Sequence, residues 1–181
     1  MKDCLARFYS STLVLVSLLA VSQPVLAALP TVTITPSTCQ LDEANSLADV
    51  TFFNNRAGHA AASGDVYLRC NVPNLCGTDT CNWYDRMQIT YIDSTTTAGN
   101  YVRAELISAA LSDGTITTGL YTVSSDDAIC TDGDSSVHTC YDTDVLSLDF
   151  SANTYFVLIR LTRSSTANSE TMFAIKIYDV P

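Results

Sequence analysis

"YFVLIRL", residues 155–161, is apolar on both of the faces that a β-strand presents. One face would carry Tyr155, Val157, Ile159 and Leu161, and the other would carry Phe156 and Leu158. Successive side chains of a strand point to opposite sides, and a strand that is apolar on both is typical of the centre of a sheet. The stretch therefore predicts a central strand, and with it a fold made of sheets.

Period-two alternation recurs along the chain, usually with one apolar and one polar face. It occurs in WYDRMQITYID (83–93), YVRAEL (101–106), VLSLDF (145–150) and MFAIKIYDV (172–180). Clusters of glycine, asparagine and aspartate separate these runs and favour turns. About eight short strands in one domain predict an all-β, two-sheet β-sandwich with jelly-roll-like connections. An immunoglobulin-like sandwich is the alternative.

Residues 1–27 have the pattern of a secretory signal peptide. Lys2 and Arg7 precede an apolar run at 13–19, and small residues around Ala27 provide a cleavage site. The apolar run is shorter than the roughly twenty residues of a membrane-spanning helix. We therefore expect a single mature domain, residues 28–181, with no integral membrane span after cleavage. It would be secreted, periplasmic or located at the cell surface.

The charge of the chain excludes one class of partner. The chain has 9 basic and 19 acidic residues; without residues 1–27 it has 7 and 18, a net charge of −11. Nucleic acid needs a basic surface, so we expect no nucleic-acid binding. The partners that remain are a glycan, another protein or a second copy of the chain.

The cysteine count indicates disulfides. After the signal peptide the chain contains Cys39, Cys70, Cys76, Cys81, Cys130 and Cys140. An even number in an exported chain is typical of a disulfide framework. Six cysteines allow fifteen pairings, of which loop lengths favour Cys76–Cys81, Cys130–Cys140 and, by remainder, Cys39–Cys70. Zinc is the alternative, but a structural zinc site needs two close pairs, and only Cys76 and Cys81 have such spacing.

An acidic stretch makes calcium a candidate cofactor. SSDDAICTDGDSS, residues 124–136, carries Asp126, Asp127, Asp132 and Asp134. Calcium takes hard oxygen ligands of this kind, although the bidentate glutamate and the flanking helices of an EF-hand are absent. The alternative is a polar turn in which the aspartates accept hydrogen bonds from their own backbone.

Aromatic side chains provide a second candidate site. Rings that stack on sugar faces are used in carbohydrate binding, and the candidates here are Trp83, Tyr84, Tyr91 and Tyr101. The alternative for Trp83 is a place in the core. Evidence for catalysis is weaker, because the mature chain has only His59 and His138 and lacks the Gly-x-Ser-x-Gly pattern of a nucleophile elbow. We expect no catalytic residues.

The order of several motifs resembles a group of exported bacterial domains of largely unassigned function. The motifs are Cys-x-Val-Pro (70–73), Tyr-Ile-Asp-Ser (91–94), Val-x-Ala-x-Leu (102–106), Tyr-x-Val-x-Ile-x-Leu (155–161) and Ile-Lys-Ile-Tyr (175–178). The resemblance spans about residues 65–180, implies a β-sandwich and brings no catalytic residues. The last strand also resembles that of fimbrial subunits, which exchange strands between protomers. Pairing of residues 31–35 with a sheet edge would allow such self-assembly.

These observations together predict a non-catalytic, secreted β-sandwich with a structural, surface-associated or adhesive role. A carbohydrate-binding module, assisted or not by calcium, is the first alternative. A hydrolase is the second and less favoured alternative.

Overall fold

The computed structural model describes residues 31–42, 45–74, 80–84, 86–131, 133–142, 144 and 146–179. The expected signal peptide, residues 1–27, lies outside these residues. In the described part of the chain, helix is limited to one 3-10 turn, η1 (Pro36–Thr38). No helix in that part has the length and apolar character that a bilayer crossing requires.

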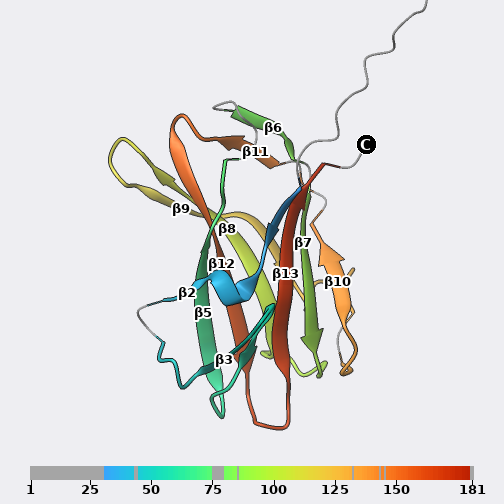
Figure 1. Cartoon of the computed structure of the whole chain (residues 1–181). Helices are drawn as coiled ribbons and strands as arrows, with labels where there is room; N and C mark the ends of the chain where they lie inside the picture. The colour runs from blue at the N-terminus through green and yellow to red at the C-terminus, as the bar shows by residue number, and fades with distance from the viewer. Residues whose placement is uncertain are drawn as a thin grey trace, which may run out of the picture.

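Two antiparallel sheets form the body of the domain, and a short two-stranded sheet lies at one end (Figure 1). The first sheet consists of β1 (Val32–Ile34), β3 (Val50–Phe53), β4 (Arg56–His59), β7 (Arg86–Asp93), β10 (His138–Tyr141) and β13 (Glu170–Tyr178). Its strand order is β10-β7-β13-β4-β3, and β1 also pairs with β13. The second sheet consists of β2 (Gln40–Leu41), β5 (Gly64–Asn71), β8 (Tyr101–Ala110), β9 (Ile116–Ser124) and β12 (Asn153–Arg163). Its strand order is β2-β5-β12-β8-β9. The small sheet pairs β6 (Thr80–Tyr84) with β11 (Leu146–Asp149). The prediction of an all-β, two-sheet sandwich is confirmed.

Several connections along the chain pass from one main sheet to the other. β4 of the first sheet is followed by β5 of the second, β7 by β8, and β12 by β13. β12 lies between β5 and β8 and pairs with both along nearly its whole length. The central strand predicted at residues 155–161 is therefore confirmed, and Figure 1 shows it in one layer with β5 and β8.

Alternation of buried and exposed positions builds the core, but it did not show where a strand changes partner. In β7 every second residue from Met87 to Asp93 is buried, and in β12 every second residue from Tyr155 to Arg163. The sequence pattern at 83–93 predicts one strand, whereas the structure has two. Thr80–Tyr84 forms β6 in the small sheet, and β7 begins at Arg86 between β10 and β13. Period-two alternation records which side chains are buried and not which strand lies alongside.

Two of the three expected disulfides are present. Cys39 is bonded to Cys70, with 4.5 Å between their Cα atoms, and Cys130 to Cys140, with 5.3 Å. The first bond joins the segment before β2 to β5, and the second joins the loop after β9 to β10. The third pairing, Cys76–Cys81, lies outside the residues whose side chains are described.

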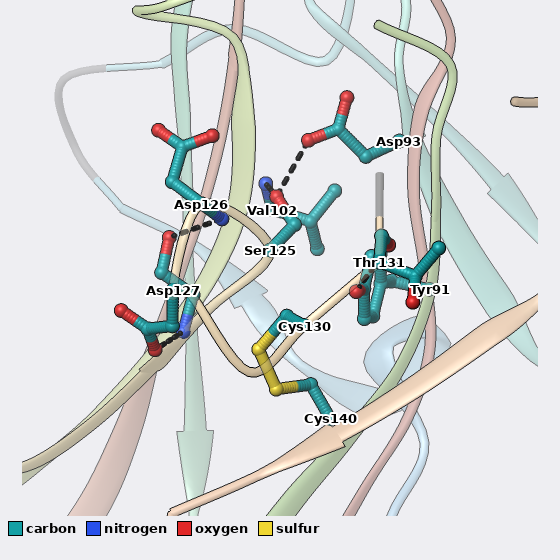
Figure 2. The surroundings of a disulfide bond; sticks show 10 residues. Tyr91, Asp93, Val102, Ser125, Asp126, Asp127, Cys130, Thr131 and Cys140 are labelled. Carbon is teal, nitrogen blue, oxygen red and sulfur yellow. Dashed lines mark hydrogen bonds between the residues drawn. A yellow bond between two sulfur atoms is a disulfide. The ribbon is translucent and has the colours of Figure 1, made fainter. Parts of the chain in front are cut away.

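One end of the interior is charged. Asp93 on β7 and Glu170 on β13 are paired residues, and their exposed fractions are 0% and 1%. Asp93 Oδ2 accepts a hydrogen bond from Ser125 Oγ at 2.5 Å (Figure 2). Neither carboxylate oxygen of Glu170 has a hydrogen-bond partner among the described residues. Burial, with the charge of Asp93 as a second cause, raises the pKa of Glu170 to about 7.

Arg163, the last residue of β12, brings a positive charge to the same end. Its Nε donates to the carbonyl of Ala61 at 2.6 Å and its Nη2 to that of Ala60 at 3.0 Å. Its Nη1 donates to the carbonyl of Asn168 at 3.3 Å. The guanidinium therefore connects the loop after β4 to the loop before β13. Its charge lowers the pKa of Glu170, but by less than burial raises it.

Candidate functional site

The outer face of the second sheet carries a connected set of charged and aromatic side chains. In β5 the buried residues alternate with Asp65, Tyr67 and Arg69, which face outward, and β8 and β12 alternate in the same way. We call this surface the Arg160 face. It consists of Gln40, Asp65, Tyr67, Arg69, Tyr101, Arg103, Glu105, Phe156, Leu158, Arg160 and Thr162.

Strand register decides which of these side chains are neighbours, because residues opposite each other on paired strands lie on the same face. One row across the sheet consists of Tyr67, Arg160 and Arg103. The next row consists of Gln40, Arg69, Leu158 and Glu105. Each row runs across the strands rather than along them, so side chains from four strands meet on one surface.

Asp65 is the centre of a hydrogen-bond network on this face. Its carboxylate accepts from Arg160 Nη2 at 2.7 Å, from Thr162 Oγ1 at 2.6 Å and from the Tyr67 hydroxyl at 3.2 Å. The Arg160 guanidinium carbon lies 5.4 Å from the ring centre of Tyr67 and 5.1 Å from that of Tyr101, within cation–π range. These contacts fix the position of the carboxylate, the guanidinium and both rings.

The charges of the network are stable at neutral pH. Burial alone would raise the pKa of Asp65, but the hydrogen bonds from Arg160 and Thr162 outweigh burial and hold this pKa below its usual value. Burial would likewise lower the pKa of Arg160, but the contact with Asp65 raises it overall. The pKa of the Tyr67 hydroxyl is raised, chiefly by burial. The face therefore presents a carboxylate, a guanidinium and a neutral phenol.

Among the hollows of the domain, two that lie on or beside this face are next to each other. One of about 200 Å³ is lined by Tyr67, Arg103, Glu105, Leu158 and Arg160. The other, of about 300 Å³, is lined by Gln40, Leu41, Asp42 and Arg69. Since Arg69 and Leu158 are opposite each other on β5 and β12, the two hollows are neighbours across the strands.

The carboxylates of this face are engaged by neighbouring side chains. The residues of the Arg160 face include no histidine, cysteine or serine that could act as a nucleophile or as a base near neutral pH. The carboxylate of Asp65 is already bonded to Arg160, and that of Glu105 lies 3.7 Å from Arg103 Nη2. What the face offers a ligand is a fixed set of donors, acceptors and rings.

The aromatic residues expected to form a sugar-binding platform lie in different places where the structure describes their side chains. Tyr84 and Tyr91 are buried in the core, so their rings have no face open to a ligand. Tyr101 lies on the Arg160 face. Trp83 belongs to β6, and its side chain lies outside the described residues. The sequence analysis therefore identified one aromatic residue of the face and placed two core tyrosines in a site.

Tyr67, Arg69 and Arg160 were missed, although the sequence carries a signal for them. In GDVYLRCN, residues 64–71, polar or aromatic positions alternate with Val, Leu and Cys. That alternation is typical of a strand with one face in the core and one in solvent. A face of this kind can be sought by comparing, over several strands, the polar and aromatic residues that alternate with the apolar ones.

The first half of the candidate calcium stretch has the contacts of a turn. Asp127 Oδ2 accepts a hydrogen bond from the backbone N–H of Ser124 at 2.8 Å. Figure 2 shows the carboxylates of Asp126 and Asp127 pointing in different directions near the Cys130–Cys140 bond. They do not converge on a common point, as the ligands of one ion would.

The second half is similar. Asp134 Oδ1 accepts hydrogen bonds from the backbone N–H of Ser136 at 2.6 Å and from His138 Nε2 at 2.8 Å. These contacts, that with His138 first, lower the pKa of Asp134. Asp132 lies outside the described residues. Within the described residues, no three acidic, histidine or cysteine side chains are grouped so as to hold a metal ion, and calcium at 126–134 stays a prediction.

Comparison with known proteins gives similarities of fold only. No family model and no curated protein sequence matches the chain. Among solved structures, the chain is similar to a xylan-binding module, CBM15, with a TM-score of 0.49 and 12% identity over 83% of this chain and 97% of that one. It is similar to the CBM36-1 domain of a multidomain xylanase from the hindgut metagenome of Trinervitermes trinervoides, with a TM-score of 0.45 and 12% identity over 84% and 99%. It is also similar to a family two carbohydrate esterase from Cellvibrio japonicus, with a TM-score of 0.39 and 12% identity over 83% of this chain and 34% of that one; it thus spans about a third of that enzyme.

Proposed function

We propose that the chain is a non-catalytic carbohydrate-binding module and that the Arg160 face is its binding surface. The observation that carries the proposal is the Asp65–Arg160 pair, held between the rings of Tyr67 and Tyr101 beside an open hollow. A site of this kind combines a few fixed polar groups with rings and one aliphatic side chain, Leu158.

The chemistry of the face matches that of a sugar. A sugar ring has hydroxyl groups around its edge and C–H groups on its two faces. Hydroxyl groups both donate and accept, so they match a fixed carboxylate beside a fixed guanidinium. The C–H faces are apolar and pack against tyrosine rings or Leu158. Because the network already holds Asp65 and Arg160 in place, little conformational entropy is lost on binding.

The structural or assembling role is less well supported. β1 pairs with β13 of the same chain, with Val32 opposite Ile177. The Cys39–Cys70 bond follows β1 closely and fixes the segment to the second sheet. A strand that is already used in its own sheet would first have to leave it before it could pair with a second copy.

We also propose that the domain is exported, that residues 1–27 are its signal peptide and that Cys76–Cys81 is a third disulfide. The two disulfides of the described residues support export, because such bonds persist in oxidising compartments. The connections that cross from one main sheet to the other fit a jelly-roll-like topology.

The test is glycan binding by residues 28–181, compared for Tyr101→Ala and Tyr141→Ala. Both tyrosines lie against an arginine: Tyr101 is 5.1 Å from Arg160 on the Arg160 face, and Tyr141 is 4.8 Å from Arg86 on the first sheet. The two substitutions therefore remove a similar contact from different surfaces. A glycan array identifies ligands, and isothermal titration calorimetry measures their affinity.

Tyr101→Ala should weaken binding by about tenfold or more, which corresponds to ~1.4 kcal/mol, and Tyr141→Ala should leave affinity unchanged. Equal losses in both variants would indicate a general loss of stability, and circular dichroism melting curves identify that case. The proposal is wrong if the wild-type domain binds no glycan, or if folded Tyr101→Ala binds as tightly as the wild type.

A further inference from the structure

We propose that the Arg160 face binds an uncharged, linear glycan that lies across the strands from β2 to β8. This inference rests on the proposed function and specifies its ligand class. Two independent features of the face support it: the pairing of its charges, which excludes an acidic sugar, and the row of hollows, which gives the ligand its direction.

Each arginine on or beside the face has its own carboxylate. Arg160 Nη2 lies 2.7 Å from Asp65 Oδ2, and Arg69 Nη2 lies 3.0 Å from Asp42 Oδ2. Arg103 Nη2 lies 3.7 Å from Glu105 Oε2. The three positive charges are thus matched by three negative charges a few ångströms away. A uronate or sulfate group needs an unmatched cation, and it would also lie next to these carboxylates.

The net charge of the rest of the chain also disfavours an acidic ligand. Residues 28–181 contain only seven basic residues against eighteen acidic ones, and three of the seven are the paired arginines of this face. A polyanion approaching the domain is therefore repelled by the overall field, and this repulsion weakens as salt screens it. A neutral sugar is not repelled by this field. Each ion pair offers its hydroxyl groups a hydrogen-bond donor next to an acceptor.

The direction of the ligand follows from the rows. The two neighbouring hollows extend from Gln40 on β2, past Arg69 and Leu158, to Glu105 on β8. Three gaps between neighbouring strands separate β2 from β8, a distance of about 14 Å. A single sugar cannot contact both ends of such a row, whereas a short chain of sugars can. Leu158 lies in the middle of this row and provides an apolar contact surface between the ion pairs.

The experiment compares oligosaccharides of matched length on the wild-type domain by isothermal titration calorimetry. The neutral set consists of β-1,4-linked hexasaccharides of glucose, xylose and mannose, and the acidic set consists of hexamers of galacturonate and mannuronate. We expect binding in the neutral set, changing by less than about twofold between roughly 0.05 and 0.5 M NaCl. We also expect the affinity of the preferred neutral sugar to rise from the monosaccharide to the hexamer.

A charge-unmasking variant provides the reverse test. Asp42→Asn combined with Glu105→Gln removes the partners of Arg69 and Arg103 and leaves the two guanidiniums unmatched. This variant should gain affinity for the acidic hexamers by about tenfold or more at low salt, and the gain should disappear at high salt. The control, Asp113→Asn combined with Asp144→Asn, makes the same change in net charge at exposed positions away from the face and should show no gain.

The outcomes separate the two levels of the proposal. Binding of acidic hexamers in preference to neutral ones, or a monosaccharide that binds as tightly as the hexamer, would overturn the ligand class while leaving a carbohydrate-binding module. An equal gain in the variant and its control would also overturn it, because overall charge and not pairing would then decide. Failure to bind any sugar of either set or of the array overturns the proposed function itself.

Discussion

Replacing Glu170 with glutamine should stabilise the domain at neutral and alkaline pH but not in acid. The carboxyl group is 1% exposed and has no hydrogen-bond partner among the described residues. Its pKa is about 7 in the folded domain against 4.5 for an ordinary glutamate. Between these values the unfolded chain has released the proton that the folded domain still holds. Raising the pH through this window therefore favours the unfolded state.

The magnitude follows from the size of the shift. Each pKa unit corresponds to ~1.4 kcal/mol, so a native pKa near 7 implies that Glu170 removes about 3 kcal/mol of stability as the pH rises from below 4.5 to above 7. Glutamine has nearly the same shape and no charge at any pH. The difference in unfolding free energy between Glu170→Gln and the wild type should therefore grow by about 3 kcal/mol across this window.

Urea unfolding at a series of pH values measures this difference directly. Taking the difference between variant and wild type removes the titration of groups that do not interact with residue 170. Asp144→Asn makes the same chemical change at an exposed position and provides the matched control. A Glu170→Gln difference that does not vary with pH would refute the reasoning, because it would mean that the folded domain already ionises Glu170 without cost.

Four further predictions concern the disulfide bonds, the acidic stretch at 124–136 and the expected signal peptide. Removing the Cys39–Cys70 bond by double alanine substitution should lower the free energy of unfolding by about 4 kcal/mol, and removing the Cys130–Cys140 bond should lower it by about 3 kcal/mol. The difference arises because the two bonds close loops with sequence separations of 31 and 10. Urea unfolding measures both losses, and a larger loss for Cys130–Cys140 would contradict this reasoning. Thiol titration of the denatured, unreduced mature chain should find no free thiol, whereas two would exclude the Cys76–Cys81 bond. The calcium site predicted at 126–134 should raise the melting temperature at millimolar calcium, and Asp132→Asn/Asp134→Asn should abolish the rise. An unchanged melting temperature would leave a polar turn, in which Asp127 and Asp134 are already engaged. Mass spectrometry of exported protein should find a mature chain beginning near Ala28, and retention of residues 1–27 would contradict the signal peptide.

The core of this domain could be predicted from the sequence because burial leaves a local signature. Alternation at 155–161 identified the central strand, and the length of the loop between Cys130 and Cys140 identified their pairing. Both inferences use residues that are close in the chain. The division of residues 83–93 into two strands could not be predicted in this way, since β6 and β7 differ in partner and not in periodicity.

The Arg160 face could not be predicted because it depends on register between distant strands. Thr162 and Asp65 are 97 positions apart, yet their side chains meet at 2.6 Å. A shift of one residue in the pairing of β5 with β12 would turn every one of these side chains to the other side of the sheet. The same limitation explains Tyr91, whose ring the sequence analysis assigned to a ligand although it lies in the core.

Arg163 has a consequence for how the domain opens. Its guanidinium holds carbonyls of two loops, at 60–61 and at 168, that belong to strands far apart in the sequence. If either loop separates from the sandwich, the buried guanidinium loses hydrogen bonds and its charge is exposed, which weakens its hold on the other loop. The two loops should therefore open as one cooperative unit, and in native-state hydrogen exchange the amides around them should lose protection with a common free energy.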